Sequence, residues 1–182
     1  MFTLQKARLP QAIEVGGSFY KIHTNYKYFL RFRELLKEKP ADIKEFDFMY
    51  LDTIPPSRLE GVRALCEFMN PPQELPRIRG NNTERVLDYD IDAPYIYAAF
   101  MEQYGIDLID TRLHWYKFTA LLHGLHDTEL NRIISARLYK PSGKNSEYDK
   151  AQQKQYEAWK LPEAEEPDEA LDEFLKNMKK TS

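Results

Sequence analysis

Apolar side chains recur three and four positions apart along most of this chain, the spacing that places them on one face of a helix. Ser57 and Glu60 have the spacing of a capping box in front of one such stretch, and Gly105 follows the end of another. Pro40 follows the end of the stretch 25–37, and the Pro-Pro pair at 55–56 follows the end of the stretch 41–51. The predicted helices are 25–37, 41–51, 58–69, 94–104, 128–139, 146–160 and 170–180, with one more between Asp110 and Gly124.

The pattern near the N-terminus alternates instead. In "AIEVGGSFYKI" the pair Gly16-Gly17 separates two short β-prone runs, and glycine adopts the positive φ angles of a tight hairpin turn. A two-stranded hairpin is only marginally stable alone, so it must pack against another element. Pairing across the turn places one set of apolar residues on a common face, namely Ile13, Val15, Tyr20 and Ile22.

The helix 25–37 is expected to be a first core helix, and three later helices carry further core stripes. Asp110 or Thr111 is the expected cap of the helix before Gly124, and Asp127 is the expected cap of the next. The helix 94–104 and the helix before Gly124, joined by "IDL", are expected to pack as an αα-hairpin. The predicted core residues are Tyr97, Phe100, Met101 and Tyr104, then Trp115, Phe118 and Leu122, then Leu130, Ile133, Ile134 and Leu138.

The acidic stretch "DYDIDAP" precedes one helix and raises the question of a metal or catalytic site. Counted from Asp88 as an EF-hand calcium loop, the sixth and twelfth positions are Ala93 and Ala99, where glycine and glutamate are needed. A catalytic carboxylate pair would have to converge on one substrate. In an extended segment, side chains alternate between two faces, so Asp88 and Asp92 lie on one face and Asp90 on the other. No base, nucleophile or oxyanion donor accompanies them in the sequence.

A helix start explains this acidic stretch better. Pro94 suits the first helical position, Ala93 before it is pushed towards an extended conformation, and carboxylates are favoured near the positive end of the helix dipole. The three aspartates therefore predict the beginning of the helix 94–104 rather than a ligand site.

Composition narrows the class of protein. The 182 residues fit one domain, and 26 Lys and Arg against 29 Asp and Glu give a net charge of −3, so nucleic-acid binding is not expected. The single cysteine, Cys66, excludes an internal disulfide and is expected to be a buried core thiol. No apolar stretch approaches a membrane span or a secretory signal, so the expected location is a cytoplasm, without membrane attachment.

Histidines offer the one metal hypothesis. His123 and His126 have helical i, i+3 spacing, with His114 nearby, but Gly124 and Asp127 are expected to break the helix between them. No nucleophile–base pair, phosphate-binding loop or metal-ligand spacing is present elsewhere in the sequence. We therefore expect no enzyme activity, no catalytic residue, no metal and no cofactor.

The expected fold is mainly α, a single multi-helix domain with a short N-terminal β-hairpin. Residues 1–162 form this domain, with a long surface loop at about 70–85 whose arginines are either solvated or face an acidic partner. Residues 163–182 are an acidic linker and a short amphipathic helix that docks on the body or on a partner.

The tyrosine-rich "YIYAAFMEQYGIDL" beside "LHWYKF", followed by "IISARLYKPSGKNSEYDKAQQKQYEAWKLP", resembles a bacteriophage family usually called the gp-fifteen proteins. The likeness is strongest from Val86 to Pro162, and the last twenty or so residues extend beyond it. Genes of this family lie in the tail-gene clusters of long-tailed phages and prophages of Gram-positive bacteria, near those of the major tail protein and the tape-measure protein. The family has no established catalytic motif.

The resemblance implies a role in tail assembly in the host bacterial cytoplasm, as a chaperone or scaffold for the tape-measure protein or other tail components. Its binding surface would use aromatic and apolar residues left over once the core is filled. These candidates are Tyr89, Tyr95, Tyr116 and Trp159, with Leu171, Phe174 and Met178 in the tail.

An alternative function also stays open, a virion structural or DNA-end adaptor protein, and so does self-association into a homo-oligomer. The adaptor would use a basic face, and its binding would weaken steeply with salt. The arginines of that face would be Arg77, Arg79, Arg85, Arg132 and Arg137.

Overall fold

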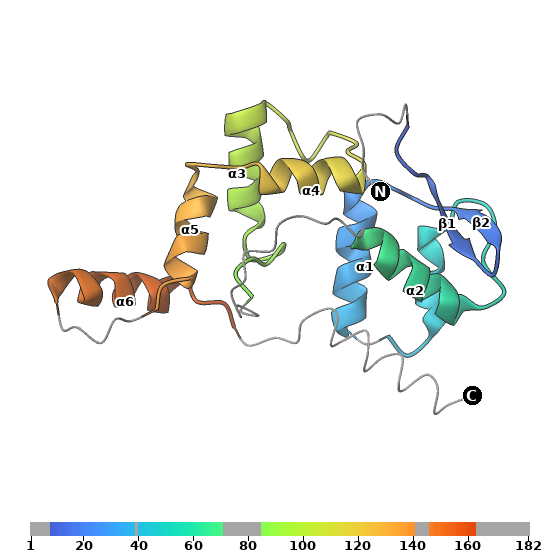
Figure 1. Ribbon diagram of the computed structural model, residues 1–182, viewed down its shortest axis with the longest axis horizontal. Helices are drawn as coiled ribbons and strands as arrows, with labels where there is room; N and C mark the ends of the chain where they lie inside the picture. The colour runs from blue at the N-terminus through green and yellow to red at the C-terminus, as the bar shows by residue number, and fades with distance from the viewer. Residues whose placement is uncertain (1–7, 39, 71–84, 141–145, 163–182) are drawn as a thin grey trace. The chain divides into compact units, whose positions relative to one another are not determined.

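A computed structural model describes residues 8–38, 40–70, 85–140 and 146–162 (Figure 1). These residues are mainly helical with a two-stranded antiparallel hairpin near the N-terminus, which confirms the predicted fold class. The predicted loop at about 70–85 and the tail from 163 lie almost wholly outside the described residues.

Contacts divide the chain into two compact units. Among the described residues, unit 1 comprises 8–38, 40–70 and 112–118, and unit 2 comprises 85–111, 119–140 and 146–162. The division falls within helix α4 (Trp115–His123), whose first turn belongs to unit 1. Hydrophobic periodicity reports which face of a helix is buried but not which neighbour buries it, so it could not reveal this division.

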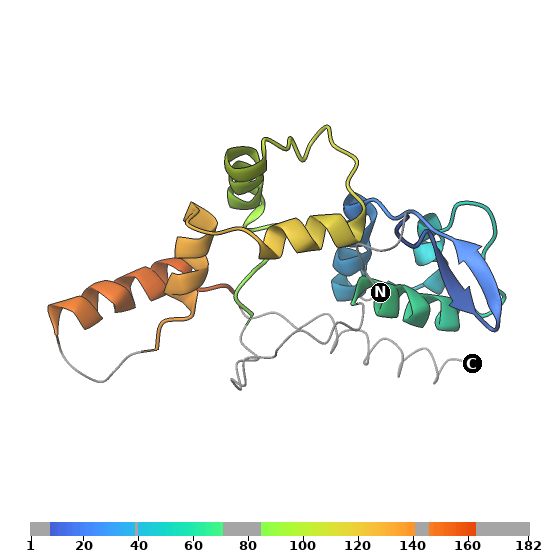
Figure 2. The same cartoon turned by 45° about the horizontal axis from the view of Figure 1, so that its top comes forward.

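The hairpin of unit 1 pairs β1 (Ala12–Val15) with β2 (Ser18–Lys21), with Ile13 opposite Tyr20. Gly16 and Gly17 have φ angles of 59° and 78°, as the predicted tight turn requires. Ile13, Val15 and Ile22 are buried and Tyr20 is half-buried, which confirms the predicted face. β1 packs against α2 (Arg58–Met69), the neighbour that the marginal hairpin needs (Figure 2).

Aromatic packing fills the core of unit 1. Phe29 of α1 (Tyr26–Glu38) lies 5.4 Å from Phe68 of α2 and 5.4 Å from Trp115, measured between ring centroids. Ser57 caps α2 by accepting the N–H of Glu60, and Cys66 is buried, both as predicted. The short stretch before the Pro-Pro pair is a 3-10 helix, η1 (Ile43–Met49), with a capping box made by Asp42 and Glu45.

The start of α4 corrects one prediction. Neither Asp110 nor Thr111 caps this helix, which begins at Trp115. The segment before Trp115 pairs with the entry to α1 instead, since the backbone N–H of Tyr26 donates to Leu113 O at 2.9 Å and the N–H of Trp115 donates to Thr24 O at 2.7 Å. Backbone pairing with the entry to α1, rather than a cap at Asp110 or Thr111, therefore accompanies the start of this helix.

Unit 2 contains α3 (Ala93–Tyr104), α5 (Glu129–Arg137), α6 (Glu147–Trp159) and the rest of α4. Gly105, at φ 63°, ends α3 as predicted. Thr128, not Asp127, caps α5, because its hydroxyl accepts the N–H of Asn131 while the Asn131 side chain accepts the N–H of Thr128. Asp127 precedes this capping box at φ 56°.

Two of the predicted core stripes need correction. In α3 the buried residues are Ile96, Ala99 and Phe100, while Met101 is 40% exposed. Almost every position of α3 is apolar or aromatic, so spacing alone did not fix its rotation. In α5 Leu138 is 41% exposed and Arg137 is buried in its place. The remaining assignments divide as follows: Trp115, Phe118, Leu122, Leu130 and Ile133 are buried as predicted, and Tyr97, Tyr104 and Ile134 are half-buried.

The last described helix, α6, is polar. Ser146 caps it, and none of its residues is fully buried. It contacts α5. Within the described ranges, the structure has no helix with the length and apolar character needed to cross a membrane.

Candidate functional site

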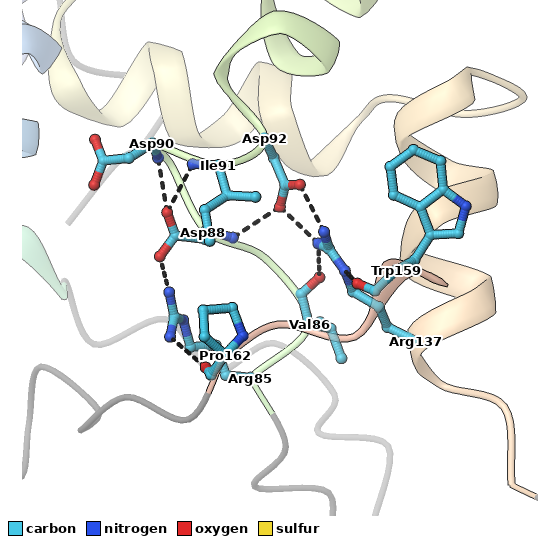
Figure 3. A network of polar contacts seen from close by, with 9 residues as sticks. All are labelled: Arg85, Val86, Asp88, Asp90, Ile91, Asp92, Arg137, Trp159 and Pro162. Atoms are coloured by element: carbon cyan, nitrogen blue, oxygen red, sulfur yellow. Dashed lines mark hydrogen bonds and ion pairs between the residues drawn. The ribbon is translucent and has the colours of Figure 1, made fainter. Parts of the chain in front are cut away.

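The acidic stretch before α3 folds into a compact turn (Figure 3). Asp88 is buried, and one of its carboxylate oxygens, Oδ1, accepts the N–H groups of Asp90 at 2.9 Å and Ile91 at 3.0 Å. The other oxygen pairs with Arg85. Asp92 is also buried and accepts the N–H of Asp88 at 2.9 Å. Both buried carboxylates are therefore engaged by protein donors.

Arg137, at the end of α5, forms the centre of this network. Its guanidinium donates to both oxygens of Asp92, at 2.6 Å and 2.8 Å, and the two side chains are only 4% and 1% exposed. It also donates to the carbonyls of Val86 at 3.0 Å and Trp159 at 2.7 Å. One buried cation thus joins the entry to α3, the end of α5 and the end of α6 (Figure 3).

The predicted helix start is confirmed, since α3 begins at Ala93 directly after the aspartates, but the buried aspartates also bind arginines. Asp92 stands at the N-cap of α3, but its side chain makes no cap hydrogen bond and turns to Arg137 instead. Asp88 and Asp92 are buried while Asp90 is exposed, which matches the predicted grouping of the three. The sequence contained a pattern that predicts the burial of Arg137. This residue lies four positions after Ile133 and seven after Leu130, on the same core-facing stripe of the helix. A charged residue at such a position requires a buried partner.

Two of the predicted partner-binding residues meet in unit 2. Tyr95 of α3 and Trp159 of α6 have ring centroids 5.7 Å apart, with an interplanar angle of 85°. Both side chains are half-buried, so part of each ring faces solvent. This edge-to-face arrangement is a favourable geometry for aromatic pairs. Tyr89, in the turn before α3, is also half-buried.

Tyr116 was expected to be left over from the core, and this is wrong. It is 4% exposed and its ring stacks on Phe68 at 4.9 Å within unit 1, so it forms part of that core. Burial raises the pKa of its hydroxyl to about 12. Leu171, Phe174 and Met178 lie outside the described residues.

Two of the three histidines that suggested a metal, His114 and His126, contact other protein groups through their rings. In unit 1 the Nε2 of His114 lies 2.9 Å from Pro10 O, and its Nδ1 accepts the N–H of Tyr116 at 3.1 Å. The ring is therefore neutral, with its proton on Nε2, and burial holds its pKa below the usual value. In unit 2 the backbone carbonyl of His126 accepts from Gln103 at 2.8 Å. Over the described part of the chain, no group of three or more His, Cys, Asp or Glu side chains could hold a metal.

A shallow polar groove of about 420 Å³ runs between α5 and α6. Its lining includes Asn131 and Ser135 from α5, and Gln152 and Gln155 from α6. The groove is therefore lined mainly by polar side chains.

Comparison with known proteins places the chain in a family. A family model described as Bacteriophage Gp15 protein matches residues 67–161, just over half of the chain. This range includes Asp92, Tyr95, Arg137 and Trp159, that is, the buried ion pair and the aromatic pair. None of the curated proteins or solved structures compared matches the chain. The family match and the resemblance of the tyrosine-rich segments agree, and the chain belongs to the Bacteriophage Gp15 protein family.

Proposed function

We propose that this protein is a non-enzymatic phage tail assembly protein, a chaperone or scaffold that binds the tape-measure protein or another tail component. It acts in the cytoplasm of the host bacterium during virion morphogenesis. Family membership supports a phage function. The tail role rests on the gene neighbourhood that the resemblance implies, and the observation that carries the binding role is the Tyr95–Trp159 pair.

This pair has the properties of a protein-binding surface. Tyrosine and tryptophan dominate the energetics of protein interfaces because each buries a large apolar area with few rotatable bonds. Tyr95 and Trp159 are half-buried and lie edge to face, so their exposed parts are held in a defined arrangement. A surface of this kind suits the apolar stripe of an amphipathic helix, the element that a long helical client protein offers along its length.

The alternative function needs a basic face, and the three arginines predicted for that face that the structure describes are all paired with carboxylates. Arg137 is buried and paired with Asp92, and Arg85 pairs with Asp88. Arg132 is exposed but pairs with Glu129 at 3.1 Å. The other two, Arg77 and Arg79, lie outside the described residues. A role as a DNA-end adaptor therefore receives less support than binding through aromatic residues.

The test is co-expression with the tape-measure protein encoded in the same gene cluster. We expect the tape-measure protein to become soluble and to co-purify, with little loss between low and high salt, because apolar contacts are weakly screened. Tyr95→Ala removes one ring of the pair and should reduce recovery. Tyr148→Ala is the matched control, since Tyr148 lies on α6, is 69% exposed and is not part of the pair. An insoluble tape-measure protein, or a complex that dissociates at high salt, would argue against the chaperone function.

A further inference from the structure

Helix α6 packs against α5 without burying any of its own side chains completely. None of its residues is fully buried, and those that are half-buried recur at helical spacing: Asp149, Gln152, Gln153, Tyr156 and Trp159. Most of this face is polar, and the groove against α5 is polar too. Because a helix of this length is marginal without tertiary packing, the placement of α6 must depend on specific directional contacts.

Two such contacts lie at opposite ends of α6. In its first turn, the Tyr139 hydroxyl donates to Asp149 Oδ1 at 2.8 Å. At its last residue, the Nε of Arg137 donates to the carbonyl of Trp159 at 2.7 Å. The second contact comes from a side chain that is itself fixed by burial and by the bidentate bond to Asp92.

The Arg137 guanidinium contacts the segments that carry both members of the aromatic pair, Tyr95 and Trp159. Asp92 is the N-cap of α3 and lies three residues before Tyr95, so the ion pair fixes the first turn of that helix. The Nε bond fixes the backbone of Trp159. Figure 3 shows Arg137 between Asp92 and the Trp159 backbone. Arg137 thus bonds the residue that precedes the first turn of α3, which carries Tyr95, and the backbone of Trp159 itself.

We propose that Arg137 is a positioning residue for a partner-binding surface, and that this surface is assembled only while Arg137 holds the end of α6 against α3. The partner is an apolar helical segment of a tail protein, and this part of the inference rests on the proposed function. Lysine cannot replace Arg137, because one ammonium group lacks the planar fork that bonds Asp92 and Trp159 in different directions at once.

The test uses the two tryptophans of the chain, Trp115 in unit 1 and Trp159 in unit 2. Incorporated 5-fluorotryptophan gives each a separate ¹⁹F NMR signal in the full-length protein. In Arg137→Lys we expect the Trp159 signal to move towards its position in the unfolded chain, with the Trp115 signal unchanged. Tyr139→Phe, which removes the other contact but leaves Arg137 intact, should leave the Trp159 signal in place.

Binding is the second readout. Arg137→Lys should weaken tape-measure binding roughly tenfold or more, as loss of an interface hot spot does, and Tyr139→Phe should not. An unchanged Trp159 signal in Arg137→Lys, or an equal change in Tyr139→Phe, would overturn the positioning role. Failure of the wild-type protein to bind the tape-measure protein would instead overturn the proposed function, since the NMR comparison requires no partner.

A measurement on the wild-type protein covers the case in which Arg137→Lys does not fold. The Nε–H of Arg137 gives a distinct ¹⁵N NMR signal. If it bonds the Trp159 carbonyl as the structure describes, its exchange with water should be much slower than that of an exposed arginine in the same protein, such as Arg132. Exchange at the rate of Arg132 would contradict the proposal.

Discussion

Replacing Asp92 by alanine should destabilise unit 2 strongly. The substitution removes two charge-assisted hydrogen bonds to Arg137, at 2.6 Å and 2.8 Å, and the bond from the N–H of Asp88. It leaves a guanidinium that is only 4% exposed without its counter-ion. Breaking a buried pair in this way costs about 3–5 kcal/mol, a large part of the roughly 5–15 kcal/mol that stabilises a typical domain.

The assay is urea denaturation of the full-length protein, followed by the ¹⁹F signals of 5-fluorotryptophan. Two compact units need not unfold in one step, and Trp159 and Trp115 report on them separately. We expect Asp92→Ala to lower the urea midpoint of the Trp159 signal far more than that of Trp115. Asp90→Ala is the matched control, because Asp90 is exposed two residues away, and its effect should stay within about 0.5 kcal/mol.

A second substitution separates the ion pair from other effects at this position. Asp92→Leu combined with Arg137→Met removes both charges, so no cation is left unpaired, and stability should recover substantially relative to Asp92→Ala. The reasoning would be refuted if Asp92→Ala were as mild as Asp90→Ala, or if the double variant were less stable than Asp92→Ala alone.

Three further predictions concern unit 1. Gly61→Ala should cost about 1–3 kcal/mol in thermal unfolding, because its Cβ would lie 2.3 Å from the Tyr50 hydroxyl and 2.8 Å from Pro55 Cγ. Tyr50→Phe alone should be neutral or stabilising, because the buried Tyr50 hydroxyl has no hydrogen-bond partner among the described residues. Combined with Gly61→Ala, it should relieve part of the cost of that substitution. A destabilising effect of Tyr50→Phe would contradict this reasoning. Burial lowers the pKa of His114 in the folded protein, so the unfolded chain takes up a proton on this histidine at a higher pH than the folded protein does. The contribution of neutral His114 to folding stability should therefore be complete above about pH 6.5 and should decline as the pH falls below it. Urea titrations from pH 7 to pH 5 that follow the Trp115 signal would test this. If the loss of stability at low pH persists in His114→Gln, another titrating group causes it.

Much of the local structure follows from local chemistry. The Gly16-Gly17 turn, the Ser57 cap and the Gly105 stop each depend on a few neighbouring residues, and all three were predicted correctly. The start of α4 was not, because the segment before Trp115 is governed by backbone pairing with residues 24–26, far away in the sequence. Periodicity contains no information about such pairing.

The candidate site was only partly predictable. Tyr95 and Trp159 were identified as candidates because they remained after the core was filled, but nothing in the spacing indicated that they meet. Their proximity depends on the bond between Asp92 and Arg137, which lie 45 residues apart. Tyr116 shows the limit of the same reasoning, since a residue off the main stripe of its helix is buried by a different neighbour, Phe68.

The measurement that tests the central claim most directly compares tape-measure binding by the wild-type protein, Tyr95→Ala and Tyr148→Ala at low and high salt. The two substitutions remove the same side chain, but Tyr95 belongs to the aromatic pair and Tyr148 is an exposed residue of α6 outside it. We predict salt-resistant binding that is lost in Tyr95→Ala and retained in Tyr148→Ala. Equal binding by all three proteins, or binding that disappears at high salt, would contradict recognition through the Tyr95–Trp159 surface.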